Sequence, residues 1–271
     1  MDFDLTDEQR LLKDSVDRLI ADRYDFEARK TYHHEPEGWS TAIWSQYAEL
    51  GLLGLPFTEA QGGFGGGPVE TMLVMEAFGR GLILEPYLAT VVLGGGVLRR
   101  AASAEQQAAL IPEIVAGTQK LAFAHLERHS RYDLGDVATT ARRDGDAWVL
   151  DGAKSVVLHG DCADRLVVTA RTGGSQRDRG GIGLFLVDAH ADGVARRGYK
   201  TQDGLRAAEV TLSGARAAAL GDPGGALPVA EHVVDEAIAA LCAEAVGAMA
   251  AMQELTVEYL KTRKQFGRAI G

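Results

Sequence analysis

Two histidines and four carboxylates are the side chains in this sequence whose types and positions could support acid–base chemistry. His125 and His159 each follow a short apolar segment, at the end of an expected strand. Histidine titrates near neutral pH, although a histidine at a strand end can equally well be packed. The carboxylates lie near the start of a long helix expected at the end of the chain, and they are Glu231, Asp235, Glu236 and Glu244. Most acids in such positions are solvated, and those in the first turn also suit the helix dipole. As single observations, all of these residues favour a structural interpretation.

Arginine and glycine form the other patterns that could bind a ligand. Arg263 is followed three residues later by Phe266 near the expected end of the long helix, where a surface ion pair is the common arrangement. Gly62–Gly67 has the composition of a phosphate-binding loop, but no Lys-Ser or Lys-Thr pair follows it. An ordinary loop is therefore the better interpretation. Gly94–Gly96 interrupts an apolar segment and indicates close helix packing.

The bulk composition excludes several classes of partner. The 271 residues include 46% hydrophobic and 24% charged residues, and the net charge is −10. An acidic chain without a basic stripe is not expected to bind nucleic acid. No segment reaches the roughly 20 apolar residues of a membrane span, and the acidic start does not have the layout of a signal peptide. The seven histidines lack the spacing of metal ligands. With two cysteines only, Cys162 and Cys242, we expect a cytoplasmic protein without a disulfide framework, a metal, a membrane or a nucleic-acid partner.

Helical signals dominate the first 118 residues. Thr6 and Gln9 form a capping box before an apolar face made by Leu11, Leu12, Val16, Leu19 and Ile20. A second helix is expected from about Ser40 to Gly51, with Ile43, Trp44, Tyr47 and Leu50 inward. Pro68 suits the first position of a third helix, which buries Met72, Leu73, Met75 and Phe78. Ser103 and Gln106 form a capping box before a short helix that ends near Ala116.

Strand signals begin at Lys120 and end near residue 221. The expected strands are Leu121–Ala124, Ala138–Arg143, Trp148–Leu150, Ser155–Leu158, Leu166–Arg171, Gly183–Asp188 and Ala208–Leu212. The Asp144-Gly145-Asp146 turn predicts a hairpin. Several short strands at this spacing indicate a small barrel or sandwich. The order of helices, sheet and helix predicts an α+β protein with domains at 1–118, 119–221 and 222–271.

The last segment predicts one long helix from Val229 to Phe266, roughly 55 Å at ~1.5 Å per residue. Its apolar residues recur at spacings of three and four, at Leu241, Ala245, Ala248, Met252, Leu255 and Tyr259. Such a seam must pack against other helices. We expect either that the native protein continues for roughly a hundred further residues, completing a helical bundle, or that the chain associates through this helix.

Motifs in all three parts of the chain resemble those of the acyl-CoA dehydrogenase family. The opening Phe3-x-Leu5-Thr6-x-Glu8-Gln9 is similar to the family's start, and Leu50–Pro56 with Gly62–Gly65 is similar to its first loop. The middle part matches at Leu121–Ala124, Trp148–Lys154 and Gly160–Asp164. The last helix carries Tyr259-Leu-x-x-Arg263-x-x-Phe266-Gly-x-x-Ile270-Gly271, which is the most specific of these motifs. Within the family, residues 131–140, 201–208 and 239–246 resemble the small subunits of pimeloyl-CoA dehydrogenases.

The resemblance implies a helical N-terminal domain, a β-domain and a C-terminal helical bundle, of which this chain supplies the start. It implies a flavoprotein of fatty-acid metabolism that binds FAD between the β-domain and the bundle and converts an acyl-CoA to the trans-2-enoyl-CoA. Its partners would be an acyl-CoA, an electron-transfer acceptor, and further subunits in a homo-oligomer or a hetero-oligomer with a large dehydrogenase subunit. The acyl group would be of medium length, including dicarboxylic, pimeloyl-like groups. The alternative is a catalytically degenerate subunit that completes the FAD site of a heteromeric dehydrogenase.

The resemblance also implies which residues contact the cofactor. The flavin-contacting residues of the β-domain correspond to His125, Leu126, Glu127, Val157 and Leu158. Leu126 and Leu158 stand where the family has hydroxyl residues, so backbone N–H groups are the expected donors to the flavin ring. Arg263 would bind the FAD pyrophosphate of a neighbouring subunit, with Phe266 near the adenosine part.

The resemblance leaves two places open for the catalytic base. In most family members it lies in the bundle, in a part that corresponds to positions beyond 271. In others it lies early in the long helix, where Ala237 stands in this chain beside Glu236. Glu236 and Glu244 are therefore the candidates within the chain, and Asp235 corresponds to a substrate-binding acid.

Overall fold

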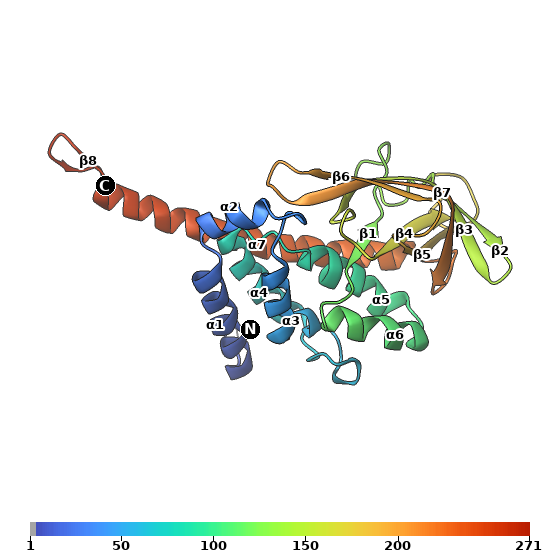
Figure 1. Ribbon diagram of the computed structural model, residues 1–271, viewed down its shortest axis with the longest axis horizontal. Helices are drawn as coiled ribbons and strands as arrows, with labels where there is room; N and C mark the ends of the chain where they lie inside the picture. The colour runs from blue at the N-terminus through green and yellow to red at the C-terminus, as the bar shows by residue number, and fades with distance from the viewer. Residues whose placement is uncertain (1–3) are drawn as a thin grey trace.

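The computed structural model describes residues 4–271, and it arranges them as a helical unit, a twisted sheet and one long helix that passes both (Figure 1). Phe3 of the opening motif lies outside the described residues. The helices before the sheet are α1 (Asp7–Arg23), α2 (Phe26–His33), α3 (Thr41–Glu49), α4 (Pro68–Gly81), α5 (Gly95–Ala101) and α6 (Ala104–Val115), with short helical turns η1 (Leu52–Gly54), η2 (Glu59–Gln61) and η3 (Leu88–Gly94).

Capping residues start these helices where the sequence predicts. Thr6 with Gln9 caps α1, Ser103 with Gln106 caps α6, and Pro68 opens α4. The prediction that three apolar side chains face the core is wrong, because Leu11, Leu50 and Met72 are all substantially exposed. Helix α2 was not expected from the sequence, and it has no buried residue, so it carries no apolar face that a pattern could reveal.

The sheet contains β1 (Leu121–Ala124), β2 (Thr140–Asp144), β3 (Ala147–Leu158), β4 (Arg165–Arg171), β5 (Ile182–Asp188), β6 (Val194–Lys200) and β7 (Arg206–Leu220). Its strand order is β1-β4-β2-β3-β7-β5, and a further pairing between β4 and β5 closes the sheet into a small barrel. Strand β6 pairs with β7 outside this ring. One apolar cluster fills the barrel interior, and a second cluster joins its outer face to the helices.

Two features of the sheet differ from the prediction. Trp148–Leu150 and Ser155–Leu158 belong to a single strand, β3, which is interrupted by register shifts at Leu150/Asp151 and Lys154/Val157. Val156 in the second shift has a positive φ of 52°. Strand β6 was missed because most of its residues are polar and at least partly exposed. The predicted hairpin between β2 and β3 is confirmed, with Asp144 opposite Ala147.

The long helix α7 runs from Leu227 to Thr262 and is shorter than predicted at its end. Arg263 has extended backbone angles, and a small hairpin follows, formed by β8 (Lys264–Gln265) and β9 (Arg268–Ala269). Phe266 in the hairpin turn is fully exposed. The prediction that Phe266 lies on the helix is therefore wrong, because Phe266 and Gly267 both adopt positive φ angles that a helix does not allow.

Glycines let α7 approach α4 closely. A Cβ atom on Gly79 of α4 would lie 1.8 Å from the carbonyl oxygen of Glu244, and one on Gly247 of α7 would lie 1.8 Å from that of Glu76. Gly94–Gly96 also packs closely, as predicted, since a Cβ on Gly94 would lie 2.5 Å from the Cβ of Leu121. These contacts fix the first half of α7 against the helical unit.

The two halves of α7 differ in burial. The first half buries Leu227, Ala230, Val233, Ala237, Ala240 and Ala243. Beyond Gly247 the helix buries no further residue, and past its Glu254–Arg80 ion pair with α4 it extends away from the sheet (Figure 1). The predicted seam is exposed in the described part of the chain, since Leu241, Met252, Leu255 and Tyr259 are all more than 40% accessible. No helix among residues 4–271 is long and apolar enough to cross a membrane.

Candidate functional site

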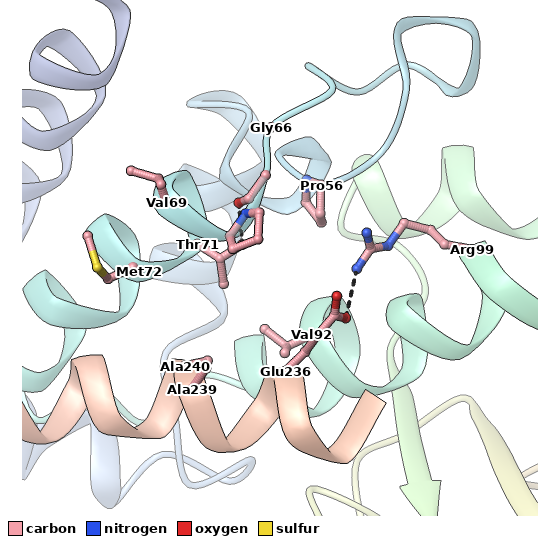
Figure 2. A pocket seen from close by; sticks show the side chains of 12 residues that line it. Pro56, Gly66, Val69, Thr71, Met72, Val92, Arg99, Glu236, Ala239 and Ala240 are labelled. Atoms are coloured by element: carbon pink, nitrogen blue, oxygen red, sulfur yellow. Dashed lines mark hydrogen bonds and ion pairs between the residues drawn. The ribbon is translucent and has the colours of Figure 1, made fainter. Parts of the chain in front are cut away.

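A cavity of about 300 Å³ lies between the start of α4, the loops before it, α5 and the first half of α7 (Figure 2). Its walls are mostly apolar and are formed by Pro56, Pro68, Val69, Met72, Val92, Ala239 and Ala240, with Gly66, Gly67 and Thr71 at the helix start. The Thr71 hydroxyl donates to the Gly67 carbonyl, and the Gly67 N–H donates to Glu70 at 2.7 Å. The polar groups of the α4 start are thus already paired within the helix.

The charged end of the cavity is formed by Arg99 and Glu236 (Figure 2). Glu236 contacts two guanidinium groups, Arg100 through a short hydrogen bond and Arg99 at 3.6 Å. His232 lies 3.6 Å from the same carboxylate. Two arginines therefore share one carboxylate, and the Nε of Arg99 is buried without a hydrogen-bond partner in the described residues. Burial, followed by the repulsion of Arg100, lowers the pKa of Arg99.

A second ion pair lies inside the sheet, and its groups are fully paired. The Lys154 Nζ donates to Glu127 Oε1 at 2.7 Å and to the Thr169 hydroxyl at 2.9 Å. Glu127 also accepts the backbone N–H groups of Ala138 and Thr139, both at 3.0 Å. Burial lowers the pKa of Lys154. Burial alone would raise the pKa of Glu127, but Lys154 and the hydrogen bonds outweigh it and hold that pKa below its usual range.

Another carboxylate, Glu85, is buried and has neutral hydrogen-bond donors only among the described residues. Tyr24 donates its hydroxyl to Glu85 Oε2 at 2.9 Å, and the Ser40 N–H donates to Oε1 at 3.2 Å. Burial raises the pKa of Glu85 to about 7, although these hydrogen bonds act in the opposite direction. Glu85 therefore titrates close to neutral pH, and no cation lies beside it in the part of the chain that the structure describes.

The residues expected at the flavin ring lie at the ends of β1 and β3. The Ser155 N–H donates to the Leu126 carbonyl at 2.9 Å, which holds the two segments side by side. Leu158 packs against the cluster that joins the sheet to the helices, whereas Val157 faces the barrel interior. The structure thus brings His125, Leu126, Glu127, Val157 and Leu158 into one region, with Glu127 turned inward to Lys154.

The two histidines at strand ends are both held in packed positions. His125 contacts the Phe123 carbonyl through Nδ1 at 3.1 Å, and burial lowers the pKa of its imidazole to about 4. His159 donates from Nε2 to the Leu84 carbonyl at 3.0 Å, and burial lowers its pKa as well. His159 therefore ties the sheet to the helical unit, and both rings are neutral at pH 7.

Arg263 and Phe266 lie far from this region of the same chain. They follow the last turn of α7, whose 36 residues span roughly 50 Å, and the hairpin is at the opposite end of the molecule from the sheet (Figure 1). The sheet lies at the start of α7, since the Ala226 N–H before that helix donates to the Ile182 carbonyl of β5 at 2.9 Å. The structure therefore does not bring Arg263 and Phe266 together with the other predicted cofactor residues.

The acidic candidates on α7 differ in their surroundings. Asp235 is exposed, and Glu236 is held by the two arginines. Glu244 is half-buried and forms no hydrogen bond or ion pair with any described residue, and burial followed by Asp203 raises its pKa. Sequence reasoning missed Arg99 as a member of the Glu236 site. The only signal was the adjacent pair Arg99-Arg100 directly after a buried apolar segment.

Two family models match the chain in succession. The acyl-CoA dehydrogenase N-terminal domain matches residues 6–118, and the acyl-CoA dehydrogenase middle domain matches residues 122–214. A relative described as probable acyl-CoA dehydrogenase YngJ, from Bacillus subtilis strain 168, is 29% identical over 100% of this chain and 73% of its own length.

Two solved structures are similar over the whole fold. One is described as the Tcur3481-Tcur3483 steroid ACAD G363A variant, with 31% identity and a TM-score of 0.87 over 97% of this chain and 69% of that chain. The other is the ChsE4-ChsE5 complex from Mycobacterium tuberculosis, with 29% identity and a TM-score of 0.88 over 100% of this chain and 71% of that chain.

Proposed function

Because the chain belongs to the acyl-CoA dehydrogenase family of flavin oxidoreductases acting on CH–CH groups, we propose that it is a subunit of an FAD-dependent dehydrogenase of acyl-CoA thioesters. The observation that carries this proposal is the ordered match of the N-terminal and middle domain models over residues 6–214. The product would be the trans-2-enoyl-CoA. When bound, FAD supplies the acceptor for the β-hydrogen as hydride and the route of electrons to an electron-transfer acceptor.

The residues at the ends of β1 and β3 fit one part of FAD, the flavin ring. The joined segments at Leu126 and Leu158 offer apolar side chains that can pack against a planar ring, and we expect backbone amides of these segments to donate to its edge. The buried lysine of these segments, Lys154, is already paired with Glu127 and is not available to a pyrophosphate. We infer that Arg263 and Phe266 from a neighbouring subunit supply that part of the site, because their own chain holds them at the far end of α7.

Of the two candidates Glu236 and Glu244, the second is the unpaired one and is our choice for removing the α-proton of the substrate. Glu244 has a raised pKa and no charged partner among the described residues, which suits a general base better than Glu236 in its ion pairs. Asp235 remains a candidate for substrate binding. A base outside the present sequence is the alternative for the α-proton.

For the substrate we propose a medium-length acyl group, including dicarboxylic groups like pimeloyl. The support is the resemblance of residues 131–140, 201–208 and 239–246 to pimeloyl-CoA dehydrogenase small subunits. Turnover rates with CoA thioesters of increasing length, with and without a terminal carboxylate, test this choice.

A second candidate function is that of a catalytically degenerate subunit in a heteromeric dehydrogenase. Leucines at positions 126 and 158, in place of hydroxyl residues, favour it. One of the similar solved structures is described as a complex of two differently named proteins, ChsE4 and ChsE5. In this function the chain would lend Arg263 and Phe266 to FAD held mainly by a large subunit.

Reconstitution distinguishes the two functions. The chain is purified alone and together with a large dehydrogenase subunit, and flavin absorbance and acyl-CoA turnover are measured in both samples. Flavin and turnover from the chain alone support the first function, whereas flavin in the mixture only supports the second. Arg263→Ala should lower flavin retention without lowering the melting temperature of the flavin-free protein, since Arg263 is exposed. Equal flavin content in this variant and the wild type would exclude Arg263 from the FAD site.

A further inference from the structure

The cavity between α4, α5 and α7 combines apolar walls with one charged end. Figure 2 shows Arg99 pointing toward the cavity from α5 and Glu236 from α7, with the apolar side chains Val69, Met72 and Val92 around the remaining space. Its volume of about 300 Å³ is at the small end of the range for small-molecule sites. The walls suit a short alkyl chain, and the charged end decides which terminal group that chain carries.

Charge balance at this end favours an anion. Glu236 provides one negative charge for two guanidinium groups, and its short contact is with Arg100, which does not line the cavity. Arg99 contacts Glu236 Oε2 at the longer distance of 3.6 Å, and both this oxygen and the buried Nε of Arg99 have no hydrogen-bond partner in the described residues. The start of α4 faces the same space, but the Glu70 carboxylate already accepts its Gly67 N–H, so Arg99 is the cation at this cavity that a ligand anion can meet.

We propose that this cavity binds the carboxylate end of a short apolar chain, with Arg99 as the residue that selects the carboxylate. An arginine with free donors forms paired hydrogen bonds with a carboxylate, while an alcohol can use only one of them. The carboxylate has two possible sources, a free fatty acid or the far end of the acyl group of a CoA thioester. The thioester source rests on the proposed function, whereas the free-acid source does not.

Calorimetric titration of the full chain with hexanoate, hexan-1-ol and hexylamine tests the proposal. Hexanoate should bind at least about tenfold more tightly than hexan-1-ol, and hexylamine should bind most weakly, because the three probes share one alkyl chain and differ in charge. Equal affinities for hexanoate and hexan-1-ol, or no detectable binding of hexanoate, would overturn the proposal.

Two variants of the charged end should change the affinity in opposite directions. Arg99→Met removes the selecting cation while leaving Glu236 paired with Arg100, so hexanoate should bind no better than hexan-1-ol. Glu236→Gln removes the opposing negative charge, so hexanoate should bind more tightly than to the wild type. Arg179→Met is the matched control, because Arg179 is exposed, is paired with Glu231 and does not line the cavity. An unchanged preference for hexanoate in Arg99→Met would contradict the role of Arg99.

A filled cavity gives an independent check of the location. Ala239 is exposed on α7 and lines the cavity, so Ala239→Trp should fold and should exclude hexanoate and hexan-1-ol alike. Circular dichroism and the melting temperature establish that each variant is folded before it is titrated. Full hexanoate binding by folded Ala239→Trp would place the binding elsewhere and overturn the proposal.

Competition then identifies the source of the carboxylate. Hexanoyl-CoA and its analogue with a carboxylate at the far end of the acyl chain are each added to the hexanoate complex. Displacement by the carboxylated thioester alone assigns the cavity to the substrate, and displacement by neither assigns it to a free fatty acid. Equal displacement by both thioesters would overturn the selection of a carboxylate. Because these titrations require neither flavin nor turnover, an inactive protein would contradict the proposed function without deciding this one.

Discussion

The ion pair inside the sheet and the ion pair at the cavity contain the same kinds of group, yet their surroundings differ. In the sheet, Glu127 meets one buried lysine and two backbone N–H groups, so all its charge is compensated. At the cavity, Glu236 is shared by Arg99 and Arg100, and buried polar atoms on both sides lack hydrogen-bond partners in the described residues. A closed network holds a fold together, whereas an unbalanced one beside a cavity retains capacity for a ligand.

The largest expected effect tests the closed network. Glu127→Ala leaves the buried Lys154 charge unpaired, and we expect the free energy of unfolding to fall by about 3–5 kcal/mol. Urea denaturation followed by circular dichroism measures this change. Replacing both partners, as Glu127→Leu with Lys154→Met, should recover much of the loss because no charge remains buried. A Glu127→Ala variant as stable as the wild type would show that water reaches Lys154.

A smaller effect is expected at Glu85. This carboxylate is buried like Glu127, but its hydrogen-bond donors among the described residues are neutral. The pKa of Glu85 is about 7 in the folded protein, compared with the ordinary value of 4.5 for a glutamate. The folded state therefore binds the proton more strongly, so this contribution to stability is full below pH 4.5 and is lost as the pH rises through about 7. The shift in pKa corresponds to a change of roughly 3 kcal/mol in the free energy of unfolding between low and high pH.

The variant Glu85→Gln isolates the Glu85 contribution. Glutamine keeps an acceptor for Tyr24 and Ser40 but does not titrate. Urea midpoints of wild type and variant should therefore converge as the pH is lowered from 8 to 5, with the wild type losing more stability at the higher pH. Parallel midpoints across this range would mean that Glu85 titrates with an ordinary pKa.

The smallest effect concerns the charged end of the cavity. Glu236→Gln removes a carboxylate that is 29% exposed, and its partners Arg99 and Arg100 also reach solvent. We expect a loss of about 1 kcal/mol or less in unfolding free energy, measured by urea denaturation beside Glu127→Ala. A loss as large as that of Glu127→Ala would remove the distinction between the two ion pairs.

Local signals explain which parts of the fold could be predicted. The capping boxes at Thr6 and Ser103, and Pro68 at the start of α4, involve neighbours in sequence, and all three are confirmed. Helix α2 and strand β6 were missed because each is short of buried apolar residues, so no periodicity marks them. The domain limits at 118 and 221 stay predictions.

The cavity could not be predicted because its charged end depends on distant parts of the chain. Arg100 and Glu236 are 136 positions apart, so the shared carboxylate exists only after α7 packs on α5. The grouping of the expected FAD residues could be predicted in part. His125, Leu126, Glu127, Val157 and Leu158 were predicted as one group and do lie together, whereas Arg263 and Phe266 were predicted on the helix and lie beyond its end. Their role at FAD remains a prediction.

The close contact between α4 and α7 has a consequence for the order in which the chain folds. Gly79 meets Glu244 across a separation of more than 160 residues, and the whole sheet lies between them in sequence. During synthesis, α7 can pack on this face of α4 only after the whole sheet and α7 itself have been made. Contacts of such long range close slowly, so we expect the helical unit to complete its folding last, although it is made first.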